Sequence, residues 1–180
     1  MIKIKPEISN YINSLTSEFR DQFGYGLDIN NLCKKLKIKV FNATFDDKNI
    51  AGAIEHLDDG SWQIQIKETD NSNRKRFTAA HELGHYISWL YKSESFTDLD
   101  TNGFHTDFSI SKTMHRSQDN NNKAEYEANE IAGRLLMPRD LVDQLVKEEK
   151  SIEDMAICFG VSIPAMTVRL KNLGYTLIEG

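Results

Sequence analysis

Residues 74–91 contain the pattern His-Glu-x-x-His, from His81 to His85, in a stretch whose apolar residues recur every three or four positions. This spacing predicts an amphipathic helix over residues 71–91. Side chains four residues apart share a helix face, so His81 and His85 can offer two imidazole nitrogens to one metal ion. Glu82 then lies beside the ion and can accept a proton from a metal-bound water. The pattern therefore predicts two metal ligands and a general base.

A second strongly periodic stretch covers residues 123–137 and predicts another helix, which Pro138 ends. Its apolar face combines small and branched residues that permit close packing on a neighbouring helix: Ala124, Ala128, Ile131, Ala132, Leu135 and Leu136. Glu125 stands at one end of this face. Because a catalytic zinc ion takes three protein ligands and a water, Glu125 is the first candidate for the third ligand.

Glu127 competes with Glu125 for the role of third ligand. It lies further round the predicted helix, near Glu130 and Arg134, and these charged neighbours favour a solvent-exposed position. Asn129 lies one turn after Glu125 and can hydrogen-bond a ligating histidine from outside the ligand set. The residues favour Glu125 and leave Glu127 as the alternative.

The chain before the motif predicts helices and then a β-rich region. Residues 1–36 are expected to hold two helices, at about 6–22 and 28–36, the second of them capped by Asp28. Residues 38–67 are expected to form the sheet, because β-branched and aromatic side chains are frequent there.

A β-hairpin is predicted over residues 50–67, where Asp59 and Gly60 form the turn between two apolar runs. Its second arm alternates apolar and polar side chains, which is typical of an antiparallel sheet with one packed face and one wet face. We expect this small sheet to pack on the helix of the motif. If the second arm is an edge strand, it can bind an extended peptide by strand addition.

Residues 92–122 are rich in Ser, Thr, Asp and Asn, and this composition predicts a long polar loop. His105 and His115 lie in this loop. A solvent-exposed position without a catalytic role is the favoured interpretation for both, and the alternative is that they bind substrate or, like Tyr126, stabilise an oxyanion.

Residues 151–174 predict two short helices joined at Gly160, with Ser162 capping the second, in the arrangement of a helix-turn-helix. The charges in this segment cancel, because two acidic residues oppose two basic ones: Glu153, Asp154, Arg169 and Lys171. Phosphate contacts supply most non-specific affinity for DNA, so direct DNA binding is not expected here. Packing against the rest of the chain is the favoured interpretation.

The composition suits one domain over residues 1–180, with 39% hydrophobic residues and a formal net charge of -5. This charge gives no electrostatic reason to expect nucleic acid as a partner. No apolar run reaches the roughly 18 residues that a membrane span needs, and no signal-peptide core is present. Cys33 and Cys158 form no C-x-x-C pair, so a thiolate zinc site is not expected, whereas a reducing cytoplasm is.

Two motifs, at residues 76–85 and 125–138, resemble those of the ImmA/IrrE metallopeptidases. The family pattern is roughly R-F-T-x-A-H-E-x-G-H followed by E-x-x-A-N-x-F-A-x-x-L-L-M-P. Weaker similarity in the flanks extends the resemblance over about residues 25–175. Ile131 stands where the family usually has Phe, a conservative change for packing.

The resemblance implies an α+β fold with a zincin-like core, a small antiparallel sheet on the motif helix and a C-terminal helical pair. It implies Zn2+ held by His81, His85 and Glu125, with Glu82 as the base. Characterised members are cytoplasmic and cleave, or promote cleavage of, helix-turn-helix repressors, which makes such a repressor the expected substrate and derepression of genes the expected outcome. The alternatives are a zinc-containing regulator that binds a partner without cutting it and a DNA-binding regulator. A structural zinc site needs no base beside the metal, so Glu82 favours the peptidase.

Overall fold

The computed structural model describes residues 4–21, 24–93 and 118–177, and within these it contains seven helices and a three-stranded sheet. The α+β class expected from the sequence is confirmed. The elements are α1 (Pro6–Glu18), α2 (Ile29–Lys35), β1 (Ile38–Ala43), β2 (Gly52–His56), β3 (Trp62–Lys67), α3 (Ser72–Ser93), α4 (Gln118–Leu136), α5 (Arg139–Lys147), α6 (Ile152–Phe159) and α7 (Ile163–Leu173).

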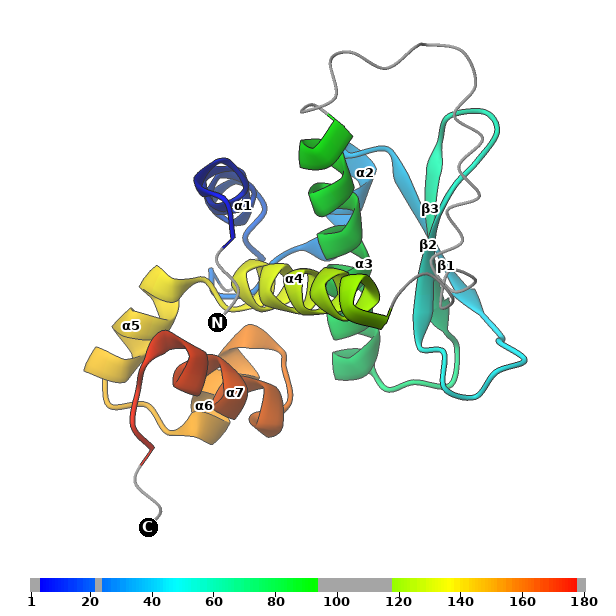
Figure 1. Cartoon of the computed structure of the whole chain (residues 1–180). Coiled ribbons are helices and arrows are strands. Elements are labelled where there is room, and N and C mark those ends of the chain that lie inside the picture. The colour runs from blue at the N-terminus through cyan, green and yellow to red at the C-terminus, as the bar shows by residue number, and fades with distance from the viewer. Residues whose placement is uncertain (1–3, 22–23, 94–117, 178–180) are drawn as a thin grey trace.

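Helix α3 occupies the centre of the arrangement. The sheet lies along one side of it and α4 crosses it, while α5, α6 and α7 gather beyond α4, away from the sheet (Figure 1). Apolar side chains of α3 at Ala80, Leu83 and Ile87 are fully buried, as the predicted amphipathic stripe requires. The helix that carries the motif is thus fixed by packing against the sheet on one side and α4 on another.

The sheet has the strand order β1-β3-β2, with β1 parallel to β3 and β2 antiparallel to β3. The predicted hairpin is confirmed, and Gly60 at its turn has a φ of 78°. The expectation of a wholly antiparallel sheet was wrong. After β1 the chain forms β2 at the far edge of the sheet. The second arm of the hairpin, β3, then returns between β1 and β2. Strand β3, the second arm of the hairpin, is therefore central rather than the edge strand considered for peptide binding, and the edge position belongs to β2.

Three element boundaries differ from the predictions. Helix α1 ends at Glu18 rather than at residue 22, because Phe19 leaves helical geometry and Arg20 pairs with Leu27 in an isolated β-bridge. Helix α3 continues to Ser93, and α4 begins as early as Gln118. The loop predicted over residues 92–122 is therefore shorter at both ends. The polar residues at the start of α4 show no apolar periodicity, so the sequence does not predict a helix there. They are helical because adding residues to an existing helix is easier than starting a new one.

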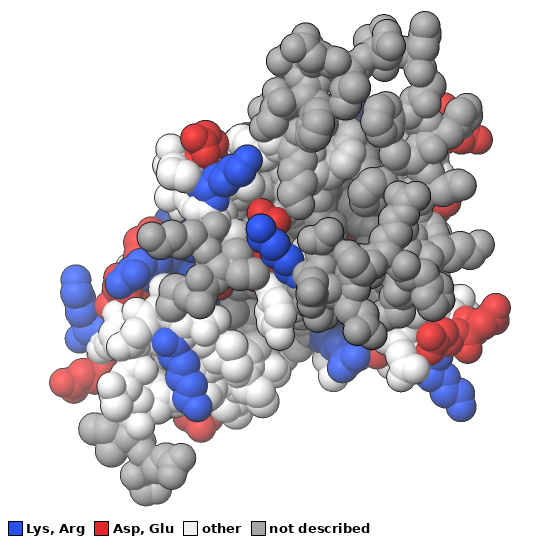
Figure 2. All heavy atoms as spheres, in the orientation of Figure 1, with Lys and Arg blue, Asp and Glu red and all other residues white. Residues whose placement is uncertain are grey.

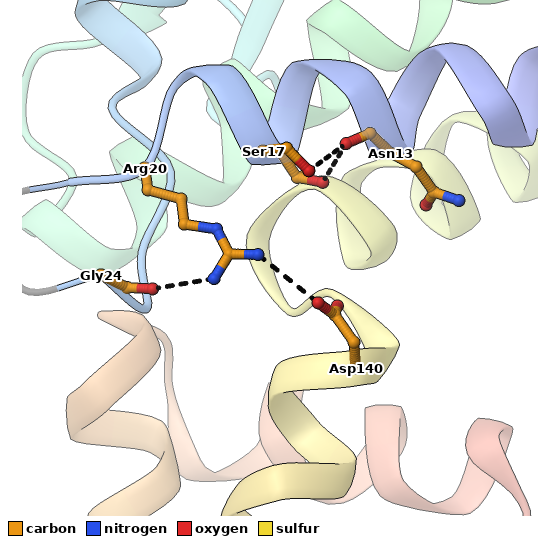
Figure 3. Close-up of polar contacts among 6 residues, drawn as sticks. Asn13, Ser17, Arg20, Gly24 and Asp140 are labelled. Atoms are coloured by element: carbon orange, nitrogen blue, oxygen red, sulfur yellow. Dashed lines mark hydrogen bonds and ion pairs between the residues drawn. The ribbon is translucent and has the colours of Figure 1, made fainter.

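Arg20 connects the segment after α1 to the C-terminal helices. Its guanidinium donates to the Gly24 carbonyl at 3.4 Å and lies 3.4 Å from a carboxylate oxygen of Asp140 on α5 (Figure 3). Both charged groups reach solvent, so this ion pair contributes little to stability, typically below about 1 kcal/mol. It joins the segment after α1 to the first turn of α5.

Helix α5 was not predicted. Pro138 occupies its N-cap position, and its buried face consists of Leu141, Val142 and Leu145, which do follow helical spacing. The predicted pair that follows is confirmed: the side chains of Ser151 and Ser162 cap α6 and α7, and Gly160 joins the two helices in a left-handed conformation.

In the view of Figure 2, acidic and basic side chains are interspersed over the described surface rather than gathered by sign. None of the described helices is long and apolar enough to cross a membrane.

Candidate metal centre

His81 and His85 project from the same face of α3, one turn apart. Their Nε2 atoms lie 3.0 Å from each other. His85 is buried and His81 is mostly buried, so both imidazoles reach the site from a packed helix rather than from a loop. Helix α3 thus places two nitrogen donors at one point, as the motif predicted.

Glu125 brings its carboxylate to the same point from α4. One oxygen lies 3.1 Å from His81 Nε2 and the other 3.2 Å from His85 Nε2. Within the described residues, these three side chains form a group whose ligand atoms all lie within 4.8 Å of one another. Glu127 does not belong to this group. The geometry therefore favours Glu125 over its competitor.

The donor set and its spacing fit a zinc ion. Zinc binds imidazole nitrogen and carboxylate oxygen at about 2.0–2.2 Å, so tetrahedral ligands lie roughly 3.3 Å from one another. His81 Nε2 and His85 Nε2 lie 3.0 Å apart, and each faces a different oxygen of Glu125, at 3.1 and 3.2 Å, so these separations are close to that value. Three protein ligands leave the fourth tetrahedral position for water or substrate.

A glycine allows α4 to approach close enough to deliver Glu125. Helices α3 and α4 touch through backbone at Gly84 and Ala128, where a Cβ on Gly84 would lie 2.7 Å from the Ala128 carbonyl oxygen. Glycine costs about 1 kcal/mol relative to alanine inside a helix. Here its missing side chain permits the helix contact that completes the ligand set.

Asn129 contacts one of the two histidines. Its side-chain oxygen lies 3.0 Å from His81 Nδ1 and accepts a hydrogen bond from the ring N–H. A proton held on Nδ1 leaves the lone pair on Nε2, the nitrogen that faces Glu125. Asn129 therefore lies within hydrogen-bond distance of His81, and its role in supporting a metal ligand stays a prediction.

Glu82 is 5% exposed and lies between α3 and the sheet. Burial raises the pKa of its carboxyl, against the opposing influence of the neighbouring histidines and of a hydrogen bond from the Ile54 backbone N–H. Gly52 on β2 lies so near that a Cβ on it would meet Glu82 Oε1 at 3.4 Å and the Gln65 carbonyl oxygen at 2.9 Å. The nearest group to such a Cβ would be the Thr78 methyl, so a glycine here allows the edge strand to pack closely on α3 beside Glu82.

The charges of the group depend on one another. Hydrogen bonds with His81 and His85 hold the pKa of Glu125 far below its usual range. Burial lowers the pKa of His81, but its hydrogen bond to Glu125 and the charges of Glu82 and Glu125 outweigh burial and raise that pKa overall. The carboxylate and imidazoles thus form a polar cluster that a cation can enter by displacing protons.

A cleft of about 470 Å³ opens onto the group. Its walls come from β2 and the segment before it, from α3 and from α4: Asp47, Asn49, Ile50, Ala51, Gly52, Ala53, Arg74, Phe77, Thr78, His81, Glu82, His85, Glu125 and Asn129. Among the described strands, β2 pairs with β3 alone, so its other edge borders this cleft. The sequence did not reveal Gly52 as part of the site; the only sign was a glycine at the start of a strand pattern.

Of the three oxyanion candidates, His105 and His115 lie outside the described residues. Tyr126 is 65% exposed and lines a neighbouring groove rather than the cleft.

Comparison with protein families places this geometry in context. A sequence model described as the IrrE N-terminal-like domain, a peptidase family, matches residues 33–171. The chain belongs to this family. The resemblance noted from residues 76–85 and 125–138 is thereby confirmed. Membership in the IrrE N-terminal-like family, together with the His-His-Glu group, indicates a metallopeptidase-like domain.

Ten chains of known structure match this one. A Mycobacterium tuberculosis transcriptional regulator superposes with a TM-score of 0.61 at 14% identity, over 95% of this chain and 48% of the regulator. This chain therefore spans about half the length of that regulator, and at this identity the match shows a shared fold alone. No curated protein sequence matches the chain.

Proposed function

We propose that this protein is a zinc-dependent endopeptidase that hydrolyses a peptide bond in a protein substrate. One observation carries the proposal: a buried carboxylate, Glu82, lies beside a three-ligand group that faces a cleft. A structural zinc site is closed by four protein ligands and has no use for a base at its side.

The chain's own residues supply the remaining chemistry. Zinc held by His81, His85 and Glu125 would polarise the scissile carbonyl and lower the pKa of a bound water. Glu82 accepts the proton of the attacking water and delivers it to the amine that leaves. Asn129 keeps His81 in the tautomer that presents Nε2. The free edge of β2 borders the cleft, so it is the surface on which an extended substrate adds as a further strand.

The substrate class rests on the family resemblance. A helix-turn-helix repressor in the cytoplasm is the leading candidate, and its cleavage derepresses genes. The other candidate function is a zinc-containing regulator that holds such a repressor without cutting it.

Mass spectrometry of a helix-turn-helix repressor encoded beside this gene tests the proposal. The repressor is incubated with the zinc-loaded protein, with Glu82→Gln and with Glu127→Gln as a matched control on the neighbouring helix. We expect fragments from the parent and from Glu127→Gln, and intact repressor with Glu82→Gln. An intact repressor that co-purifies with all three proteins supports the non-cutting regulator instead. A repressor that is neither cut nor bound contradicts this substrate class.

A further inference from the structure

A second hollow continues from the metal-site cleft. It is a groove of about 710 Å³ between α4 and α7, and Phe77 and Asn129 line both the groove and the cleft. Tyr126, the residue after Glu125, lines the groove as well. A polypeptide bound at the metal site therefore has a direct path into this groove.

The walls of the groove are mainly apolar. The side chains that supply this character come from α3, from the turn after α4 and from α7: Phe77, Met137, Pro164, Ala165 and Val168. Val168 is 56% exposed, although a valine gains free energy when it is removed from water. The groove thus offers an apolar surface that a neutral side chain can cover.

The charged residues in the lining are Glu130 and Arg169, and they already have partners. Arg169 donates to the Met137 carbonyl at 3.0 Å and lies 3.7 Å from Glu130, which also accepts from Arg134 at 2.8 Å. Arg169 is buried, so its charge is balanced inside the protein rather than presented to a ligand. This charge balance favours a neutral occupant over an acidic or basic one.

Gly133 lies in the groove where α4 faces α7. A Cβ there would meet nothing nearer than Arg169 Cδ, at 3.9 Å, so the position has room for a side chain. Gly133 follows Glu125 by eight residues on the same helix. That separation is about 12 Å at 1.5 Å per residue. An extended peptide covers this distance in about four residues.

We propose that the groove is a specificity subsite that holds a large apolar side chain of a polypeptide bound in the cleft, about four residues from the scissile bond. The proposal rests on the peptidase function proposed above and adds a substrate preference to it. The occupant is a Leu, Ile, Met or Phe side chain of the substrate chain.

A random synthetic dodecapeptide library tests the subsite in two assays. The first identifies the bonds cut by the zinc-loaded protein, and the second sequences the peptides captured by zinc-loaded Glu82→Gln. Each assay is repeated with Gly133→Leu, which fills the groove, and with Gly133→Ala, which leaves most of it open. We expect at least a fivefold enrichment of large apolar residues about four positions from the cut, kept by Gly133→Ala and lost by Gly133→Leu.

Each other outcome has a defined meaning. Cleavage without that enrichment, or with an enrichment that Gly133→Leu leaves unchanged, overturns the subsite and leaves the peptidase function standing. Capture of apolar peptides that Gly133→Leu abolishes, with no cleavage by any protein, overturns the peptidase function and supports the groove as a peptide site. Absence of enrichment in both assays overturns the subsite. A dimer by light scattering that Gly133→Leu converts to a monomer also overturns it, because a second copy of this chain is then the occupant.

Discussion

Gly84 on α3 lies against the backbone of Ala128 on α4, so that a Cβ on Gly84 would stand 2.7 Å from the Ala128 carbonyl oxygen and 2.9 Å from its Cα. The contact is between two backbones, which cannot give way as a flexible side chain can. It sets the distance between the helix that carries His81 and His85 and the helix that carries Glu125. Ligand geometry and helix packing therefore depend on the same residue.

Replacing Gly84 by alanine should destabilise the protein and weaken metal binding. The added methyl group forces α4 outward, and overpacking of this kind costs about 1–3 kcal/mol. Urea unfolding measures the loss of stability, and competition with a chromophoric chelator measures zinc affinity. Gly133→Ala is the control, since that glycine lies on α4 with its nearest obstacle at 3.9 Å. It should gain up to about 1 kcal/mol from helix propensity. Equal stability changes at the two positions would show that the close approach does not matter.

Removing the side-chain amide of Asn129 should reduce zinc affinity by about 10- to 100-fold, the usual effect of losing a partner of a ligating histidine. Asn129→Ala frees His81 Nδ1, whereas Asn129→Asp keeps an oxygen acceptor 3.0 Å away and should retain affinity. Chelator competition gives both affinities, and thermal melts of the metal-free variants check that folding is intact. Unchanged affinity in Asn129→Ala would remove the proposed orienting role.

The buried thiol of Cys33 should make stability fall in alkaline solution. Burial raises the pKa of Cys33 from 9.0 to about 12, so the folded chain keeps a proton that the unfolded chain releases. Between these values the unfolded state binds fewer protons, and the free energy of unfolding therefore decreases as pH rises. Urea unfolding at pH 8 and at about pH 10.5 measures the slope. Cys33→Ala should show a shallower slope than Cys158→Ala, in which Cys33 remains. Identical slopes in the two variants would contradict this effect.

Arg169 should matter for stability, although it lies in the segment that resembles a helix-turn-helix. Its side chain is 5% exposed and contacts Glu130 and the Met137 carbonyl, so it joins α7 to α4 rather than facing solvent. Removing one partner of a buried ion pair costs about 3–5 kcal/mol. We expect Arg169→Ala to lose stability of this order in urea unfolding. Lys171→Ala, two residues away and exposed, should change stability by less than about 0.5 kcal/mol. Similar losses in both variants would mean that burial of Arg169 contributes nothing.

The sequence was most informative where a feature is local. The period of α3 places His81 and His85 on one face, and the small residues of α4 signal the close packing that brings Glu125 to them. The turn at Gly60 and the cap at Ser162 are local as well, and the structure has both.

Features that depend on distant parts of the chain were harder to predict. The parallel pairing of β1 with β3 and the central position of β3 follow from the path between strands, which no strand pattern records. The role of Gly52 beside Glu82 arises only when β2 packs on α3. Helix α5 is a different case, since its buried residues Leu141, Val142 and Leu145 follow the helical period and its pattern is local.

The most direct test of the zinc centre is an anomalous-diffraction map from crystals of the zinc-loaded protein, recorded on both sides of the zinc absorption edge. We predict one peak about 2.0–2.2 Å from His81 Nε2, His85 Nε2 and a Glu125 oxygen, with a water in the fourth position and Glu82 beside it. A peak at another place in the chain, or an ion closed by a fourth protein ligand, would contradict a catalytic zinc centre.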